Sequence, residues 1–303
     1  MLETFLNNKD MRILVTGKNG QLGQSIQKLV NNSRHCITKH NFKDFIFVGR
    51  EELDLSSLKN IAKCFNVNEN FDIIINCAAY TSVDKAEEEI ELADQINHQA
   101  VKQLAKVADS KKSKLIHIST DYVFDGKRSY PYIEDDETNP INVYGKTKLA
   151  GEKALNEIMK TNAIIIRTSW LYSEYGNNFV KSMLKLGKEN QEIDVVCDQI
   201  GSPTNAADLA ETILTIINNY VHNNQEQSNK IYHYSNEGEL SWYEFAKEIF
   251  QQAKIECQIN PISLNEFVTK AKRPLYTVMK KSKIKNVQFY NWQKSLLKLK
   301  GLI

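Results

Sequence analysis

The stretch Arg12-Ile-Leu-Val-Thr-Gly-Lys-Asn-Gly-Gln-Leu-Gly23 joins a short apolar run to three evenly spaced glycines. The apolar run ending at Gly17 predicts a buried parallel strand, and apolar residues then recur at helical spacing from Leu22 to about Asn31. A glycine turn between a strand and a helix is typical of dinucleotide pyrophosphate binding. Gly17 permits the tight turn, Gly20 lets the backbone approach phosphate, and Gly23 lets the helix pack closely.

The alternation of apolar runs and helical patterns continues along the chain. A helix follows Pro140, and a long helix is expected from Ala86 to Ala108. Strands alternating with helices predict an α/β fold, a Rossmann-type doubly wound parallel sheet with a smaller C-terminal lobe. The expected strands are Phe45–Val48, Phe71–Asn76, Lys114–Ser119, Ala163–Thr168, Ile193–Cys197 and Ile231–Tyr234, and the later helices are Ala206–Asn219 and Trp242–Ala253.

Composition excludes several classes of protein. The 303 residues carry a net charge of +2, which gives no reason to expect a nucleic-acid partner. No apolar run approaches the roughly 20 residues that span a membrane, and residues 1–10 do not resemble a signal peptide. The five cysteines are scattered without a C-x-x-C pair, so buried free thiols are expected rather than a metal site or disulfides. We therefore expect a cytoplasmic protein.

The end of the second expected strand bears on cofactor choice. This strand ends in Val48-Gly49-Arg50, where an acidic residue would select a ribose 2′-hydroxyl and a basic residue a 2′-phosphate. Arg50 therefore favours NADPH, and Asp54 and Leu55 are placed to flank the adenine. The alternative is a solvated Arg50 in a protein that also accepts NADH.

Tyr144 and Lys148 lie four residues apart on the helix after Pro140. A phenol has a pKa near ~10, and a nearby ammonium lowers it by favouring the phenolate. Residues at this spacing are neighbours on a helix, so Lys148 can act on Tyr144 while binding the nicotinamide ribose. Tyr144 would then give its proton to a carbonyl oxygen as hydride arrives at carbon. Thr120, at the end of a strand, would donate a second hydrogen bond to that oxygen.

These motifs, in this order, resemble the extended short-chain dehydrogenase/reductases, and most closely the branch of dTDP-4-dehydrorhamnose reductases. The resemblance spans Met11 to about Pro274. It implies the fold predicted above and NAD(P)H-dependent reduction of the 4-keto group of dTDP-4-dehydro-L-rhamnose to dTDP-L-rhamnose. The segments that carry it are Gly17–Gly23, Asn76–Glu87, Ser119–Gly126, Asn142–Lys153, Arg167–Tyr172, Asp198–Thr204 and Arg273-Pro274.

The resemblance also assigns functions to residues and regions. It implies an N-terminal extension (1–10), an NAD(P)-binding Rossmann domain (11–170, to which parts of 205–235 return) and a nucleotide-sugar-binding lobe (171–204 and 236–303). The catalytic residues would be Thr120, Tyr144 and Lys148. The cofactor would also meet Gly17, Asn19, Gly20, Gln21, Leu22, Gly23, Ala78, Ala79 and Tyr80, and the sugar would meet Val83, Thr120, Asp121, Tyr122, Trp170 and Arg273. For Trp170, a place in the apolar core is the alternative.

Two departures from the family pattern limit what is carried over. Some members hold magnesium at a dimer interface through glutamates, one of them two residues after the last glycine of the turn. That position is Ser25 here, so no metal is predicted and a homodimer stays open. Residues 1–10 lie outside the resemblance.

Three alternative functions stay open. A nucleotide-sugar dehydratase would need a second carboxylate beside the strand-end threonine, but Thr120-Asp121 is followed by Tyr122. A 4-ketoreductase for another nucleotide 6-deoxysugar, such as one giving the opposite C4 configuration, would need the same residues. A non-catalytic, NADP-binding protein resembling the regulatory subunit of methionine adenosyltransferase would keep the fold without turnover.

Overall fold

The computed structural model describes residues 11–32, 42–66, 70–222, 230–299 and 301–303. The N-terminal extension and Cys36 lie outside the described residues. Within them, six parallel strands form one sheet in the order β10-β5-β4-β3-β1-β2. The strands are β1 (Met11–Thr16), β2 (Phe42–Val48), β3 (Ile73–Asn76), β4 (Lys114–Thr120), β5 (Ala163–Thr168) and β10 (Lys230–Tyr234).

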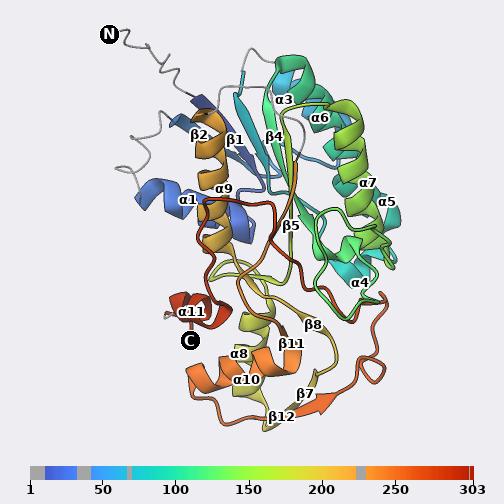
Figure 1. Cartoon of the computed structure of the whole chain (residues 1–303), viewed down its shortest axis with the longest axis vertical. Helices are drawn as coiled ribbons and strands as arrows, with labels where there is room; N and C mark the ends of the chain where they lie inside the picture. Colours follow the sequence, from blue (N-terminus) through green and yellow to red (C-terminus); the bar gives the residue numbers. More distant parts are fainter. Residues whose placement is uncertain (1–10, 33–41, 67–69, 223–229, 300) are drawn as a thin grey trace.

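Helices cover both faces of this sheet (Figure 1). On one face α1 (Gln21–Asn32) packs against α9 (Ala206–His222). On the other lie α3 (Leu58–Asn66), α6 (Ala100–Lys111) and α7 (Val143–Ile158). The predicted doubly wound parallel sheet is therefore confirmed.

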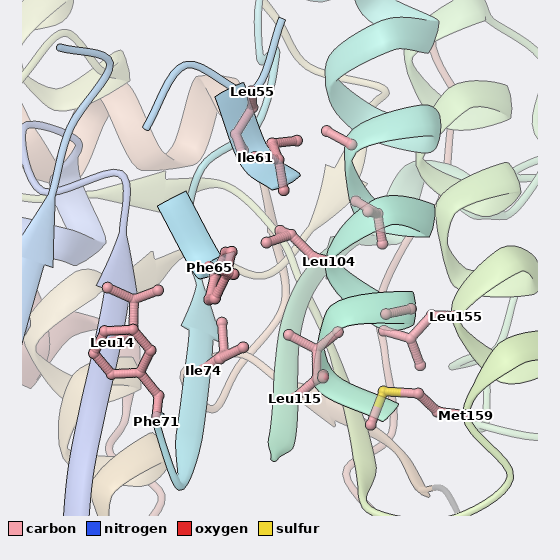
Figure 2. Packing of buried hydrophobic residues seen from close by; sticks show 14 of the residues in the cluster. Leu14, Leu55, Ile61, Phe65, Phe71, Ile74, Leu104, Leu115, Leu155 and Met159 are labelled. Carbon is pink, nitrogen blue, oxygen red and sulfur yellow. The ribbon is translucent and has the colours of Figure 1, made fainter. Parts of the chain in front are cut away.

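Alternate residues of each strand supply two separate cores, as the two-residue period of a strand requires. Ile13 and Val15 of β1 face α1 and α9, whereas Leu14 faces the opposite layer. Figure 2 shows this second core, in which strand residues meet side chains of α3, α6 and α7. The labelled members are Leu14, Leu55, Ile61, Phe65, Phe71, Ile74, Leu104, Leu115, Leu155 and Met159.

The sheet has its switch point at β1, which pairs with β2 on one side and with β3 on the other. Ligands of doubly wound sheets bind at the carboxyl ends of the strands beside such a point. The glycine turn after β1 and residues Cys77 to Tyr80 after β3 both leave the sheet at this edge.

The prediction of one long helix from Ala86 to Ala108 is confirmed only from Ile90 onward. A short helix, α4 (Val83–Ala86), ends before residues 87–89, and a continuous helical run follows, made of α5 (Ile90–Asp94), a π-helical turn (Gln95–Gln99) and α6. The π-helical turn contains the buried Asn97, whose side chain accepts a hydrogen bond from the backbone N–H of Tyr80 at 2.9 Å and donates to the Tyr80 carbonyl at 3.0 Å. These two hydrogen bonds fix the π-helical turn against the loop that follows β3.

A smaller lobe lies beyond the carboxyl edge of the sheet (Figure 1). Its apolar core joins α8 (Phe179–Glu189), α10 (Trp242–Ala253) and α11 (Trp292–Leu296) to β7 (Glu192–Val196), which pairs in parallel with β12 (Gln258–Ile262). The predicted helix Trp242–Ala253 is confirmed; a capping box of Ser241 and Glu244 begins it. The short pairs are β6 (Leu171–Tyr172) with β9 (Thr204–Asn205) and β8 (Ile200–Gly201) with β11 (Leu240–Ser241).

Two expectations from composition can be compared with the described residues. Cys64, Cys77, Cys197 and Cys257 are free thiols, but each retains partial exposure instead of the full burial expected. Over the same residues, no helix combines the length and apolarity needed to cross a bilayer.

Gly151 of α7 controls how closely this helix approaches the π-helical turn. A Cβ on Gly151 would lie 2.2 Å from the Asn97 carbonyl oxygen. We expect Gly151→Ala to lower the free energy of unfolding by about 1–3 kcal/mol, because overpacking must push the backbones apart. Urea unfolding measures this change. Lys153→Ala, at an exposed position of the same helix, is the control; equal stability of the two variants would contradict the prediction.

Candidate active site

The glycine turn forms a cradle at the carboxyl end of β1. Gly17 has a φ of +73°, and a Cβ there would lie 2.9 Å from the Ala78 nitrogen. A Cβ on Gly23 would lie 2.2 Å from the Gly17 carbonyl oxygen, so this helix start requires glycine. Gly20 is exposed, and a Cβ there would lie 3.3 Å from the Gly17 carbonyl oxygen. Because the first N–H groups of α1 have no intrahelical partners, this cradle fits a dinucleotide pyrophosphate.

Side chains around the turn divide into ligand-accessible and structural ones. Asn19 and Arg50 are exposed, and the Arg50 Nε lies 3.7 Å from the Asp54 carboxylate. Leu22 and Leu55 are buried in the two cores, so only their backbones remain for ligand contact. Arg50 is therefore available to a 2′-phosphate.

Gln21, predicted as a cofactor residue, uses its side chain elsewhere. Its Nε2 donates to the Leu171 carbonyl at 3.2 Å, and its Oε1 accepts from Ser173 at 3.0 Å and from Asn178 at 2.9 Å. These bonds tie the start of α1 to the segment that begins the smaller lobe. Only the backbone of Gln21 therefore remains for the cradle.

The chain after β3 runs beside the glycine cradle, and hydrogen bonds fix its backbone there. The Ala78 N–H donates to the Thr16 hydroxyl at 3.3 Å, and Asn97 binds both backbone groups of Tyr80. The Tyr80 phenol donates to Glu89 at 2.7 Å. Ala78 and Ala79, both small and partly exposed, leave room for a flat ligand beside Gly17.

The start of α7 brings Tyr144 to the end of β4. Asn142 caps the helix by accepting from the Gly145 N–H at 2.7 Å. A Cβ on Gly145 would lie 2.2 Å from the Tyr122 carbonyl oxygen, so the helix begins in direct contact with the chain after β4. As a result the Tyr144 ring meets the Tyr122 ring edge-on at 5.8 Å, and the Tyr144 phenol lies near the Thr120 hydroxyl.

Burial raises the pKa of Tyr144, and the charges of Asp121 and Tyr122 raise it further, while the hydrogen bond with Thr120 lowers it. The phenol is therefore protonated at neutral pH, as a proton donor must be. Lys148 is not among the groups that act on it. The Lys148 ammonium is fully buried and donates to the Ile118 carbonyl at 2.6 Å. The expectation that Lys148 lowers the pKa of Tyr144 is not met in this ligand-free geometry.

Thr120 and Asp121 form a buried polar pair at the same strand end. The Thr120 hydroxyl donates to the Asp121 carboxyl at 3.0 Å and accepts from the Tyr122 N–H at 3.2 Å. Burial raises the pKa of Asp121 to about 6, although its hydrogen bonds lower it in part. Asp121 thus titrates just below neutral pH.

Arg273, predicted to meet the nucleotide sugar, pairs with Asp84 at the start of α4. Its two terminal nitrogens contact the two Asp84 oxygens at 3.1 and 2.6 Å. The neighbouring Lys272 carbonyl accepts from the Asn142 side chain at 2.8 Å, which links this segment to the cap of α7. Val83 begins α4 beside this pair and is partly exposed. The Asp84 carboxylate therefore balances the positive charge of Arg273 in this structure.

Trp170 stands between the sheet and the smaller lobe. Its backbone has a φ of +46°, and its ring stacks on Trp242 at 3.4 Å with an interplanar angle of 9°. A Cβ on Gly201 would lie 2.6 Å from the Trp170 ring, so glycine is needed there. The ring is half-buried, and its indole N–H is buried without a hydrogen-bond partner among the described residues.

Sequence reasoning missed three residues of this region. Gln199 is buried, accepts from the Trp242 indole at 3.1 Å, and leaves its amide nitrogen without a partner in the described chain. Asn97 and His117 are also buried polar residues. Gln199 lies in a segment that carried the family resemblance, and His117 interrupts an apolar strand; these signals could have found both. Asn97 gave no such signal.

Comparison with known proteins agrees with this geometry. The profile described as the RmlD substrate binding domain matches residues 11–300. The chain belongs to this family. A dTDP-4-dehydrorhamnose reductase of Sinorhizobium fredii is 38% identical over 296 residues, covering 95% of this chain and 96% of that protein. A reductase of the same name from Aggregatibacter actinomycetemcomitans is 38% identical over 302 residues, covering 96% and 98%.

A solved structure of an RmlD family member carries the cofactor. The dTDP-4-dehydrorhamnose reductase of Bacillus anthracis in complex with NADP is 39% identical, has a TM-score of 0.85, and covers 96% of this chain and 98% of that one. The predicted resemblance is confirmed by this agreement in sequence and fold.

The buried Asp121 makes this RmlD family member sensitive to pH. Its folded pKa of about 6 exceeds the ordinary value of 3.8, so the folded chain holds the proton more tightly than the unfolded chain. Stability from this group is present at low pH and is lost as the pH rises to about 6. We expect Asp121→Asn to raise the free energy of unfolding by about 2–3 kcal/mol over the parent at pH 7, as measured by urea unfolding. At about pH 4.5 the difference in unfolding free energy between the two proteins should be smaller. A pH-independent difference would contradict this.

Proposed function

We propose that this chain reduces the 4-keto group of dTDP-4-dehydro-L-rhamnose to dTDP-L-rhamnose with NADPH. The observation that carries the proposal is the protonated Tyr144 phenol near Thr120 at the carboxyl edge of the sheet, beside the glycine cradle. Relatives that cover nearly the whole chain carry the name of this reductase, which supports the substrate. The NADP complex of the Bacillus anthracis reductase supports the cofactor.

Different residues are proposed to bind the cofactor and to transfer the proton. NADPH, when bound, supplies the hydride. The backbone from Gly17 to Gly23 binds the pyrophosphate, and Arg50 binds the 2′-phosphate. Lys148 would bind the nicotinamide ribose by turning its buried ammonium away from the Ile118 carbonyl. Tyr144 donates its phenolic proton to the sugar carbonyl oxygen, and Thr120 donates a hydrogen bond to the same oxygen.

The sugar nucleotide is proposed to bind between the sheet edge and the lobe of residues 171–204 and 236–303. Trp170 offers a buried indole N–H that has no hydrogen-bond partner among the residues the structure describes, and a sugar oxygen or phosphate would satisfy it. Arg273, oriented by Asp84, offers a guanidinium for the diphosphate. The remaining proposed contacts are Val83, Asp121 and Tyr122.

We expect purified protein to oxidise NADPH when dTDP-4-dehydrorhamnose is supplied, and to yield dTDP-L-rhamnose. Loss of reduced-nicotinamide absorbance, followed separately with NADPH and NADH, measures rate and cofactor preference because Arg50 favours the 2′-phosphate. Product analysis by nuclear magnetic resonance gives the C4 configuration. A C4 epimer would indicate the 6-deoxytalose-type reductase instead. NADPH binding without oxidation of any 4-keto sugar nucleotide would favour a regulatory subunit.

We expect Tyr144→Phe to bind NADPH as the parent does and to lose about 10²–10⁴-fold in kcat, because the variant lacks the donated proton. Cofactor fluorescence measures binding, and the absorbance assay measures kcat. Tyr130→Phe, which removes a hydroxyl from an exposed tyrosine, is the matched control and should keep both values. Near-parental turnover of Tyr144→Phe would assign the proton to another residue.

A further inference from the structure

A row of buried polar side chains crosses the sheet beneath α7. Thr16 of β1 pairs in register with Asn76 of β3, and Asn76 pairs in register with His117 of β4. Register partners on parallel strands share a face, and this is the face on which Leu14, Ile74 and Leu115 pack against α3, α6 and α7. Each of the three polar side chains is at most 1% exposed. Polar groups this deep are retained only when hydrogen-bonded.

The hydrogen bonds along this row set the direction of each donor. The Thr16 hydroxyl accepts from the Ala78 N–H, so its own hydrogen is free to donate to the Asn76 amide oxygen, at 2.6 Å. The Asn76 amide nitrogen then lies 3.1 Å from the His117 Nδ1 and donates to it. A neutral imidazole that accepts at Nδ1 carries its proton on Nε2.

The His117 Nε2 faces the Lys148 amino group at 3.5 Å. A protonated Nε2 offers a hydrogen to Lys148, which a neutral amine can accept and an ammonium cannot. The Lys148 ammonium instead donates to the Ile118 carbonyl. The charge of Lys148 and burial together hold the pKa of His117 well below its usual range, so the ring stays neutral.

We propose that His117, oriented by Asn76 and Thr16, is a positioning residue for Lys148: it directs the amino group and opposes its protonation. The row begins at the Ala78 N–H, beside the glycine cradle, and ends at Lys148. Lys148 is thereby coupled to the strand ends along which the cofactor is proposed to bind. This inference rests on the proposed function in one respect, namely that Lys148 binds NADPH.

The other groups that act on Lys148 are few. Burial lowers its pKa to about 8, while Glu152 on the same helix and the Cys77 thiol after β3 raise it. His117 and the Ile118 carbonyl approach from β4. Because the Ile118 carbonyl is fixed in the backbone, the variable partner of Lys148 is His117, whose effect depends on whether its Nε2 carries a proton.

The first test is the proton position on His117 in the cofactor-free protein. With ¹⁵N-labelled histidine, long-range proton–nitrogen correlations distinguish the two neutral tautomers and the imidazolium. The His117 signal is the one absent from His117→Leu. We expect a neutral ring protonated at Nε2 from about pH 6 to about pH 9. Asn76→Asp should move the proton to Nδ1, because a carboxylate accepts where the amide donates. A parent ring protonated at Nδ1 would overturn the proposal.

The second test is the pH dependence of NADPH affinity, measured by cofactor fluorescence without sugar. Affinity for NADPH should fall as Lys148 loses its proton. A plot of affinity against pH should therefore change slope near the Lys148 pKa of about 8, and this pH is called the break. His117→Leu should move the break about one pH unit higher, because the opposing N–H is gone. Asn76→Asp should move it at least as far, because a bare Nε2 can accept from the ammonium. Lys148→Met should remove the break.

The matched control is His233→Leu, at the other fully buried histidine of the sheet, whose ring contacts the Lys280 carbonyl instead. It should leave the break unchanged, whereas a purely structural role for His117 would make both variants behave alike. Thermal melting confirms folding of each variant. If folded His117→Leu and Asn76→Asp keep the parental break, or Lys148→Met retains one, the proposal fails. The tautomer result is independent of turnover, so it stands apart from failure of the proposed reaction.

Discussion

The parallel register of β1, β3 and β4 is the constraint on which the rest of the structure depends. It ends three neighbouring strands at one edge, where Gly17 follows β1, Cys77 follows β3 and Thr120 is the last residue of β4. The glycine cradle, the open chain after β3 and the Thr120 hydroxyl are then neighbours without any further adjustment. The same register aligns Thr16, Asn76 and His117 across the sheet, which explains how a polar row can exist inside an apolar core.

The close packing of α7 places the candidate catalytic side chains at this edge of the sheet. Helix α7 touches backbone at two glycines, with Gly145 against the Tyr122 carbonyl and Gly151 against the Asn97 carbonyl. These contacts leave α7 little freedom to slide, and they hold Tyr144 and Lys148 over the end of β4. Asn97 extends the restraint by binding both backbone groups of Tyr80. A buried polar network of this kind is stable only when every member is satisfied, and then it specifies one arrangement.

The sequence predicted what depends on local pattern. The apolar run before Gly17, the spacing of Tyr144 and Lys148, and the alternation of elements led to the parallel sheet and to a reductase-like site. The π-helical turn and its Asn97 contacts with Tyr80 escaped prediction because those contacts join residues 17 apart through the fold. The Asp84–Arg273 pair joins residues 189 apart, and no periodicity reports on it. The expected effect of Lys148 on Tyr144 failed because helical spacing says nothing of the Ile118 carbonyl, which the ammonium binds instead.

The protonation of Tyr144 connects the fold to the direction of the proposed chemistry. A reductase needs a phenol in its resting state, whereas an enzyme that begins with alcohol oxidation needs a phenolate. Burial and the neighbouring Asp121 raise the pKa of Tyr144 in the ligand-free protein, so the donor form dominates at neutral pH. Lys148, whose ammonium donates to the Ile118 carbonyl and faces His117, is not among the groups that lower the pKa of Tyr144. These features keep the phenol protonated, whereas efficient proton donation also requires its pKa to fall toward the working pH when substrate and cofactor bind.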